Sequence, residues 1–397
     1  MPNYQVYYGE YTLYYWIQMI LKREIVLPIY QRDFVWTEND VKNLMTSLSE
    51  DQYIPQIIIG HYQDSKNEFN YVLDGQQRLS AILLAWYGYF PKKEKFGKKR
   101  ENFSDYNDDE YDNEDDDNVK EWSFNEIQKL YDENNNLDDY LKESDYYSKL
   151  NFTNIIINDD FMNTKKLGFA YIRPITNNSN EQKKYYSTMF RNINISGVNL
   201  TPMEIRASLY WLDEKLQPFL QPDKHKIGKI EIGTITKNKI DFARYIALLS
   251  EYHKSQSHEN IAKGYGSRGG KSIEVYIENF IYDIVNKRQK SNFYIFDNDF
   301  DYKSKLEQLD KSLYDFNLKD SYNSIIEADY YLFGLIYYII FSTKHINLDM
   351  REQLHNNVKT LIAEANDNSA HRKTPNALKY LRNRIIDSIK IYKEVFK

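Results

Sequence analysis

The chain has 397 residues and a net charge of −6, and its 42% of hydrophobic and 16% of aromatic residues suffice for packed cores, which excludes wholesale disorder. It has no cysteine, so disulfides, thiolate metal sites and cysteine nucleophiles are excluded, and a reducing cytoplasm is the expected location. At about 150 residues per domain, this length allows two or three domains.

The first 90 residues show mixed helical and strand periodicity. The N-terminus lacks the basic and then apolar layout of a signal peptide. The predicted elements are a helix at 12–22, a short strand at 25–28, a helix that Thr37 opens in a capping box with Asp40, strands at 57–59 and 71–73, and an apolar helix at 79–86. This mixture predicts a small α+β domain.

Gln31 and Arg32 form the first candidate binding element. They follow Pro28, where the backbone is expected to be extended. Glutamine and arginine directly after a strand suit the polar wall of a pocket. The alternative is an exposed strand end, with Trp36 as an ordinary core residue.

The segment Asp-Gly-Gln-Gln-Arg, from Asp74 to Arg78, carries the strongest chemical signal. It lies where a strand is predicted to turn into a helix, and the first N–H groups and the dipole of a helix favour bound phosphate. Gly75 allows a ligand close to the backbone. Gln76 and Gln77 add amide donors, and Arg78 can hold two phosphate oxygens with its forked guanidinium.

A purely structural role for this segment is the alternative. Asp74 would then cap the helix, Gln77 would reach back to it, and Arg78 would pair with a carboxylate. Two glutamines and an arginine in one helical turn beside a glycine favour the functional interpretation.

Residues 91–121 differ in character from their surroundings. A basic block at 92–100 precedes an acidic block, and residues 101–121 hold eleven acidic side chains against Lys120. This stretch of −10 leaves about +4 for the rest of the chain, so that net charge neither indicates nor excludes a nucleic acid partner. We interpret 91–121 as an inserted, solvated loop without chemistry. Residues 122–178 give only weak signals.

Two capped helices flank a third candidate element. A capping box at Ser179–Gln182 is predicted to open a helix that ends near Arg191, and Thr201–Glu204 is a second capping box with proline at the first helical position. Between the helices, Asn192 and Asn194 suit a hard cation, a base or a phosphate. The alternative is turn chemistry, because Asn and Gly are common at helix ends.

The rest of the chain has helical periodicity. Helices are predicted at 240–252, 273–285, 325–341, 350–364 and 376–395. The longest apolar run, Tyr330–Phe341, is too short for a bilayer, which needs about 20 residues, so a buried helix is predicted. The expected architecture is an α+β domain at 1–215, with the charged insert, and a larger, mostly helical domain at 216–397.

The segment Gly264–Ser272 nearly spells a phosphate-binding Walker A loop. However, Tyr265 occupies the position that requires the first glycine, and the segment follows a helix rather than a strand. A flexible connector is the leading interpretation. The alternative is a loop in which Arg268 and Lys271 contact phosphates, for example those of DNA.

Three segments resemble, in order along the chain, the motifs of the N-terminal domain of GmrSD-type restriction systems. They are Leu27–Trp36, Leu73–Leu79 and Phe190–Glu204. The resemblance covers roughly residues 10–90 and 180–210, with a looser helical part to about 280. Three motifs in the family's order are specific.

The resemblance implies a ParB/sulfiredoxin-like α+β fold that binds nucleotides, and hydrolysis of NTPs coupled to DNA restriction. By position, it makes Asp74, Gln76 and Arg78 catalytic. It implies nucleotide binding by Gln31, Arg32, Gly75, Gln77, Arg191 and Asn194. A Mg²⁺ ion on the phosphates is expected, with Asn194 as its candidate ligand. Sulfiredoxin chemistry is excluded, because it needs a cysteine.

The chain departs from many relatives that carry a C-terminal His-Asn-His-type nuclease domain. None of its seven histidines forms such a core. The nearest stretch, His371–Asn376, is interpreted as a basic loop before a helix. The chain therefore resembles a GmrS-like half that acts in antiviral defence with a separately encoded nuclease.

Three functions follow, in order of preference. The first is a Mg²⁺-dependent NTPase that gates a partner nuclease on DNA, with Arg78 and Arg32 holding phosphates and Asp74 or Gln76 orienting the attacking water. The second is a nucleotide-switched DNA-binding module without significant hydrolysis. The third is a stand-alone DNA nickase.

Overall fold

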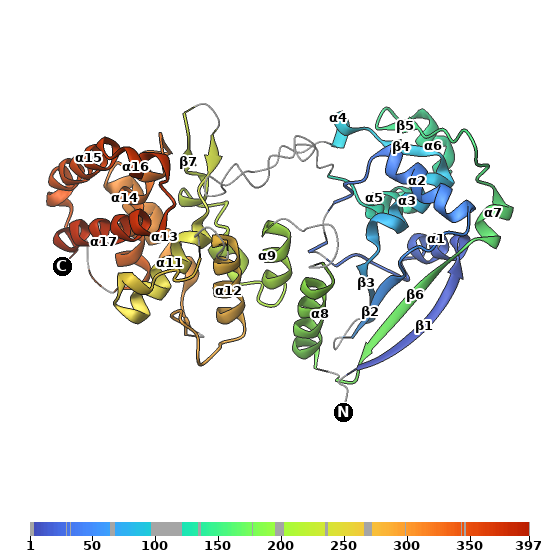
Figure 1. The fold of residues 1–397 in the computed structure, drawn as a ribbon, viewed down its shortest axis with the longest axis horizontal. Coiled ribbons are helices and arrows are strands. Elements are labelled where there is room, and N and C mark those ends of the chain that lie inside the picture. Colours follow the sequence, from blue (N-terminus) through green and yellow to red (C-terminus); the bar gives the residue numbers. More distant parts are fainter. Residues whose placement is uncertain are drawn as a thin grey trace. The chain divides into compact units, whose positions relative to one another are not determined.

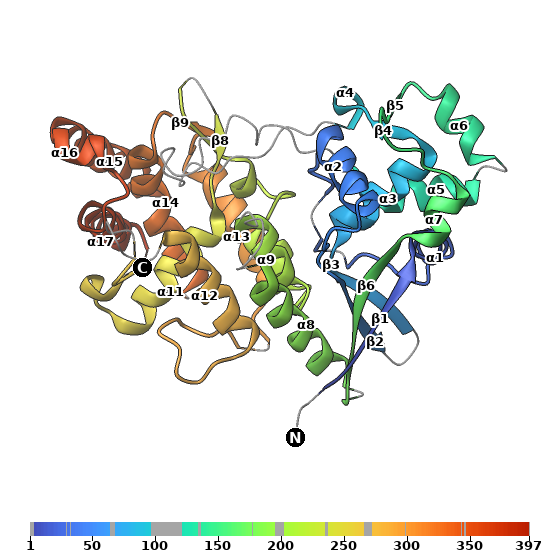
Figure 2. The ribbon, with the colours of Figure 1, turned by 45° about the vertical axis from the view of Figure 1, so that its right-hand side comes forward.

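The computed structural model divides into two compact units, one that ends at Glu204 and one that begins at Ile205. Figure 1 and Figure 2 show the ribbon from two directions. The structure describes residues 4–28, 30–31, 33–63, 68–96, 121–133, 136–176, 178–194, 202–234, 237–265, 272–297, 299–342, 344 and 347–396.

A four-stranded mixed sheet organises the first unit, in the order β1-β6-β2-β3. Its strands are β1 (Tyr4–Thr12), β2 (Ile57–Gln63), β3 (Glu68–Asp74) and β6 (Lys166–Pro174). β6 is antiparallel to β1 and parallel to β2, and β3 is antiparallel to β2. The predicted α+β class with a mixed sheet is confirmed, and the strands predicted at 57–59 and 71–73 lie within β2 and β3.

Two long strands have no counterpart in the sequence prediction. β1 and β6 pair from Tyr4 opposite Pro174 to Thr12 opposite Lys166, and they lie side by side in Figure 1. Tyrosines point to both faces of β1, so no apolar–polar alternation marks it. The strand predicted at 25–28 is wrong, because Val26 there forms only an isolated bridge, to Tyr71.

Helices cover one face of the sheet and share a core with it. They are α1 (Leu13–Leu21), α2 (Glu38–Ser49), α3 (Gln76–Tyr87) and α5 (Phe124–Glu133). From the sheet, Ile57, Ile59 and Val72 enter this core. The apolar faces of these helices are therefore buried against the sheet.

Helix α8 (Ser179–Asn194) packs on the opposite face of the sheet. It contacts Gly60 of β2, and because successive strand residues point to opposite faces, Gly60 faces away from the core that contains Ile59. A Cβ added to Gly60 would lie 2.5 Å from the ring of Tyr186. The hydroxyl of Tyr186 donates to the backbone oxygens of His61 and Ile172. A small residue in β2 thus admits the ring that anchors α8.

Helix ends follow local signals, with one correction. Thr37 and Asp40 form the predicted capping box, and Thr12 caps α1. The cap predicted at Ser179 is wrong, because Asn178 accepts from the Glu181 N–H at 3.2 Å instead. The amide of Gln182 does not reach back to the helix start. It donates to the oxygen of Thr176 and accepts from the N–H of Gln63, each at 2.9 Å.

The segment at 91–121 is interpreted as a solvated loop from its sequence, but its first residues form ordered elements. The small elements nearby are β4 (Tyr89–Pro91), α4 (Lys93–Phe96), α6 (Leu137–Glu143), β5 (Tyr147–Lys149) and α7 (Asp159–Thr164), and β4 pairs with β5. Lys95 and Lys92 bind Asp145 at 2.5 and 2.9 Å, and their hydrogen bonds lower the pKa of Asp145 to about 2. Part of the basic block is therefore structural. Residues 97–120 lie outside the described part.

The second unit is mainly helical, as predicted. The helices from the boundary onward are α9 (Pro202–Tyr210), which spans it, α10 (Leu216–Leu220), α11 (Phe242–Ser255), α12 (Ile273–Val285), α13 (Tyr302–Asp315), α14 (Ile325–Ile340), α15 (Arg351–Asp367), α16 (Ser369–Lys373) and α17 (Leu378–Val395). A small sheet joins β7 (Glu231–Ile232), β8 (Asn238–Lys239) and β9 (Ser321–Tyr322). The five predicted helices correspond to α11, α12, α14, α15 and α17, and Pro202 opens α9.

Helix α14 contains the longest apolar run up to Ile340, and every residue of the helix except Tyr337 is buried. The prediction of a buried helix is confirmed. In the parts of the chain described, no helix is both long and apolar enough to cross a membrane.

Candidate functional site

The Asp-Gly-Gln-Gln-Arg segment joins β3 to α3, as predicted. Asp74 is the last residue of β3 and Gln76 the first of α3. Gly75, between them, has φ 94° and ψ 9°, the left-handed region that favours glycine. Glycine offers no side chain to cap the first turn. The positive end of the α3 dipole and its first N–H groups are therefore suited to an anion.

Packing imposes a second requirement for glycine at this turn. A Cβ added to Gly75 would lie 2.3 Å from Cδ1 of Ile57 and 3.2 Å from a terminal nitrogen of Arg78. The backbone of the turn therefore lies directly against β2. The Arg78 guanidinium also lies beside this turn.

Arg78 forms an ion pair with Asp74, one turn earlier. The distance from Arg78 Nη2 to Asp74 Oδ2 is 2.6 Å, and the same nitrogen lies 3.4 Å from the oxygen of Gln56. The Arg78 side chain is 14% exposed, and its buried Nε has no hydrogen-bond partner within the described residues. The pairing of Arg78 matches the structural alternative, but the guanidinium keeps an unused donor.

Gln31 closes the end of β3. Its Nε2 donates to the oxygens of Val72 and Leu73, at 2.9 and 3.1 Å. The register between β2 and β3 shifts at this point, between Ile58 and Ile59. An irregular ladder leaves carbonyl groups that need a side-chain donor. Gln31 therefore positions the strand end from which Asp74 projects.

Gln77 binds the segment that carries the first motif. Its Oε1 accepts from the N–H of Val35 and its Nε2 donates to the oxygen of Asp33, both at 3.0 Å. The structural alternative expected the side chain of Gln77 to reach back to Asp74, but its partners are Val35 and Asp33 instead. Gln31 and Gln77 together hold the first and second motifs against each other.

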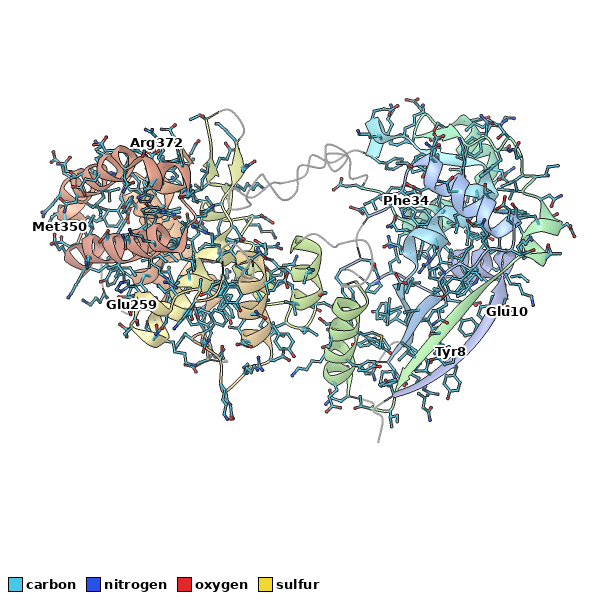
Figure 3. The ribbon with its side chains drawn as sticks, in the orientation of Figure 1. Tyr8, Glu10, Phe34, Glu259, Met350 and Arg372 are labelled. Carbon is cyan, nitrogen blue, oxygen red and sulfur yellow. The ribbon has the colours of Figure 1, made fainter. Side chains whose placement is uncertain are left out.

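The same segment is anchored from its other side by Phe34. Its N–H donates to the oxygen of Trp122 at 2.7 Å, and the two rings meet edge to face with centroids 5.3 Å apart. Figure 3 labels Phe34. Gln76, the remaining candidate of the first turn, is only 3% exposed. The amides of this turn are therefore largely buried, which favours positioning over direct contact with a ligand.

Several candidates cannot be placed at the site. Arg32, Arg268 and Lys271 lie outside the described residues. Arg191 and Asn194 belong to the C-terminal part of α8, but their side chains are not among those described. Their assignments to nucleotide, metal or DNA stay predictions.

His371, from the stretch weighed as a nuclease site, belongs to the core of the second unit. Its Nε2 lies 2.8 Å from Nη1 of Arg384, and its ring stacks on Tyr380 with centroids 4.4 Å apart. Burial, and then the charge of Arg384, lower the pKa of His371 to about 4. These contacts give the histidine a structural role.

Two residues at the site were missed by sequence reasoning. Gln56 offers its backbone oxygen to Arg78, and Ile57 packs on Gly75. The apolar run 57–59 indicates a strand, but no local signal tells which residue faces the glycine. Among the described residues, no three His, Asp or Glu side chains gather in a way that could hold a metal ion.

Comparison with known proteins bears on the same part of the chain. Residues 16–211 match the family described as "GmrSD restriction endonuclease, N-terminal domain". An uncharacterized protein of Methanocaldococcus jannaschii is 35% identical over 92 residues, a match that covers 18% of this chain and 16% of that protein. The chain thus matches only a small part of that relative. No solved structure matches the chain.

The family match contains all three motifs and the turn that Gln31 and Gln77 hold together. It ends seven residues after the boundary of the first compact unit, so it covers nearly all of that unit beyond β1. Residues 16–211 are therefore an N-terminal domain of the GmrSD type, from restriction systems.

Proposed function

We propose that this domain binds a nucleoside triphosphate at the start of α3 and hydrolyses it, and that it thereby gates a separately encoded nuclease acting on DNA. The observation that carries the proposal is the partly buried Arg78 guanidinium beside a helix start that has no side-chain cap. Within the described residues its Nε has no partner. The GmrSD family match supports the setting of a restriction system.

The phosphates would lie across the first turn of α3. Backbone N–H groups there and the positive end of the dipole stabilise phosphate oxygens. Arg78 would exchange Asp74 for a phosphate oxygen and so stabilise charge that develops during transfer. Asp74, released from its 2.6 Å ion pair, would orient the attacking water.

Mg²⁺ fits the residues at this turn. A magnesium ion on a nucleotide usually needs one or two protein carboxylates, because waters and phosphate oxygens fill the other positions. Asp74 is such a carboxylate, and its side chain is 36% exposed. When bound, the ion would neutralise phosphate charge.

Gln31 and Gln77 act as positioning residues in this proposal. The amide groups of both form hydrogen bonds with backbone atoms, those of Gln31 at the end of β3 and those of Gln77 in the segment at 33–35. They would hold the two motifs in register around the nucleotide rather than touch it.

Phosphate release from ATP, GTP, CTP and UTP with Mg²⁺ tests the proposal. Arg78→Ala should lower turnover about 100-fold or more, as the loss of one stabilising donor does. Arg23→Ala is the matched control, because Arg23 also pairs with a carboxylate, Asp132, but at the exposed surface. It should change turnover less than about twofold.

Full turnover by Arg78→Ala would overturn the site. A folded protein without turnover, whose DNA binding nevertheless depends on a nucleotide, would be the nucleotide-switched module instead. Nicking of DNA by the chain alone with Mg²⁺, abolished by Asp74→Ala, would make it a nuclease.

A further inference from the structure

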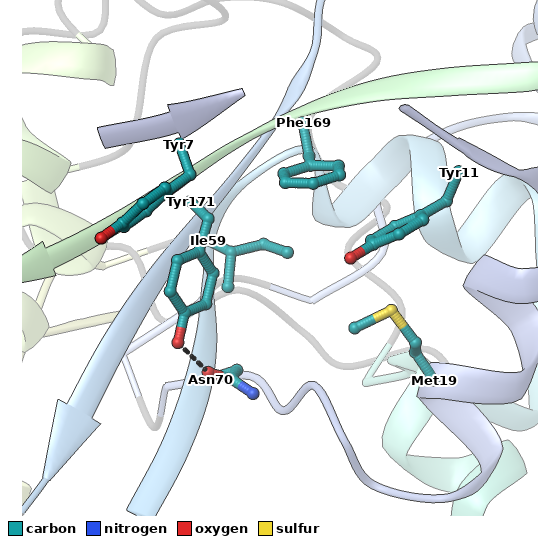
Figure 4. A pocket seen from close by; sticks show the side chains of 7 residues that line it. All are labelled: Tyr7, Tyr11, Met19, Ile59, Asn70, Phe169 and Tyr171. Carbon is teal, nitrogen blue, oxygen red and sulfur yellow. Dashed lines mark hydrogen bonds between the residues drawn. The ribbon is translucent and has the colours of Figure 1, made fainter. Parts of the chain in front are cut away.

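A second concave site lies on the sheet of the first unit. This aromatic hollow has a volume of about 360 Å³. It is lined by Tyr7, Tyr11, Met19, Ile59, Asn70, Phe169 and Tyr171 (Figure 4). Asn70 precedes Asp74 by four residues in β3, which is roughly 13 Å at about 3.3 Å per residue. The hollow is thus distinct from the turn that begins α3.

Strand register brings the rings together. Tyr7 of β1 is opposite Tyr171 of β6, which is opposite Ile59 of β2, so the three form one row on one face. In the next row Phe169 is opposite Gly9, and a Cβ on Gly9 would lie 2.8 Å from the ring. The absent side chain lets the Phe169 ring lie over β1.

The rings form two flanks of the hollow. Phe169 stacks on Tyr11 with centroids 4.5 Å apart and planes 20° apart. Figure 4 shows Tyr7 and Tyr171 on one side of the hollow and Tyr11 on the other, with Ile59 between them. A flat ring that enters between these sides meets aromatic surface on two flanks.

Polar groups at one end have a set orientation. Tyr171 donates its hydroxyl hydrogen to Asn70 Oδ1 at 3.0 Å, and Asn70 Nδ2 donates to the oxygen of Glu24 at 3.0 Å. His61 Nδ1 lies 3.0 Å from the same hydroxyl. An amide nitrogen has two N–H donors, and Glu24 takes one of those of Asn70, so among the described residues the other is available for the edge of a ligand.

Charges of both signs stand near the hollow. Arg173 follows Tyr171 by two residues on the same face of β6, and Glu68 lies 3.5 Å from His61. Neither a small free cation nor a small free anion is favoured by such a mixture. A neutral ring attached to a phosphate that reaches Arg173 fits it better.

Aromatic surface continues beyond the hollow. Tyr15, 44% exposed, lies 4.5 Å from Tyr11 between ring centroids, and Tyr7 is 52% exposed. Successive bases of one strand need such a continuing platform, whereas a single nucleotide does not. This continuity favours a strand of DNA over a free nucleotide.

We propose that the aromatic hollow takes an unstacked base of single-stranded DNA. Base faces stack on aromatic side chains, and base edges bond to amide and hydroxyl groups. The inference rests on the proposed DNA partner of the domain and not on nucleotide hydrolysis. Strand contact at the sheet would place the domain on DNA that is locally unpaired.

Binding of a fluorescent single-stranded 12-mer to the full chain, followed by anisotropy without nucleotide, tests the proposal. Tyr7→Ala should weaken binding about tenfold, within the range that loss of one stacking ring gives. Tyr8→Ala is the matched control, because Tyr8 is the next residue of β1, points to the opposite face and is 72% exposed. It should change affinity less than about twofold.

A second variant separates the ring from its hydroxyl. Tyr7→Phe loses only the hydroxyl, which donates to Gln5 at 2.9 Å, and should bind like the wild type. The same strand in a blunt duplex should bind more weakly, because its bases stay stacked. Melting temperatures confirm that each variant is folded.

Three results would overturn the proposal. They are equal losses in Tyr7→Ala and Tyr8→Ala, no binding of the single strand by the wild type, and a loss in Tyr7→Ala that affects free nucleotides but not the 12-mer. Phosphate release by the wild type is measured separately. Hydrolysis can therefore fail while the base site stands, and the base site can fail while hydrolysis stands.

Discussion

At the scale of single residues, Gly75 carries two separate constraints. Its φ of 94° is unfavourable for other residues, and its position meets Ile57 Cδ1. The first constraint could be predicted, because a glycine between a strand and a helix often serves a left-handed turn. The contact with Ile57 could not, since the side chain comes from a strand 18 residues earlier.

The two constraints on Gly75 can be separated by mutation. Gly75→Ala should lower the free energy of unfolding by about 1–3 kcal/mol from the backbone alone, and by more through the overlap with Ile57. Ile57→Val removes Cδ1, and should cost about 0.5–1.5 kcal/mol by itself. In the double variant the free energy of unfolding should fall by less than the sum of the two single losses. Urea unfolding of the four proteins measures this coupling, and strict additivity would contradict the contact.

Gln31 and Gln77 show what residue types alone can predict about the candidate site. Gln31 and Gln77 are at the predicted site, and their amides do donate hydrogen bonds there. Their partners are backbone atoms of each other's motifs instead of a ligand. A sequence reveals the donor, but the nearest acceptor depends on which segments the fold brings together.

At the scale of elements, α8 and the sheet also depend on contacts that the local sequence does not reveal. A capping box at 179–182 predicts α8, but Asn178 caps the helix instead of Ser179, and Gln182 accepts from the N–H of Gln63 in β2. β1 and β6 are missed altogether, since their stability comes from pairing across more than 150 residues. Helices depend on contacts three and four residues apart, and sheets do not.

Tyr186 should account for much of the attachment of α8. Tyr186→Phe removes one donor from the oxygens of His61 and of Ile172, and should lower the free energy of unfolding by about 1–3 kcal/mol. Tyr185→Phe is the control, because Tyr185 is the neighbouring residue and its ring lies tilted against that of Tyr4, with centroids 5.2 Å apart. It should cost less than about 0.5 kcal/mol. Equal costs in urea unfolding would refute the role of the Tyr186 hydroxyl.

At the scale of the whole molecule, a buried charge cluster ties the second unit together. Asp329 of α14 accepts from Arg244 of α11 and Arg384 of α17, with oxygen–nitrogen distances of 2.9 to 3.1 Å. Burial alone would raise the pKa of Asp329, but the two guanidinium groups hold it below its usual value. Tyr245 adds a further donor at 2.8 Å.

This cluster should make the stability of the second unit depend on pH through His371. The pKa of His371 is about 4 in the folded chain, against about 6.5 for an unperturbed histidine. Because the unfolded chain then binds more protons, the free energy of unfolding should fall as pH is lowered from about 6.5 to about 4. His371→Gln should flatten this fall. Unfolding midpoints of both proteins across that range measure it, and parallel curves would count against the prediction.

The sequence by itself determined what depends on short range. The α+β class of the first unit, the helices of the second, the turn at Gly75 and the cap at Thr37 all follow from a few neighbouring residues. The three motifs could likewise be recognised in the sequence, and the family match covers them. The tertiary structure alone decided the strand order, the partners of Gln31 and Gln77, the aromatic hollow and the burial of His371. Each of these joins side chains that are distant in the chain, and only the folded backbone sets which of them meet.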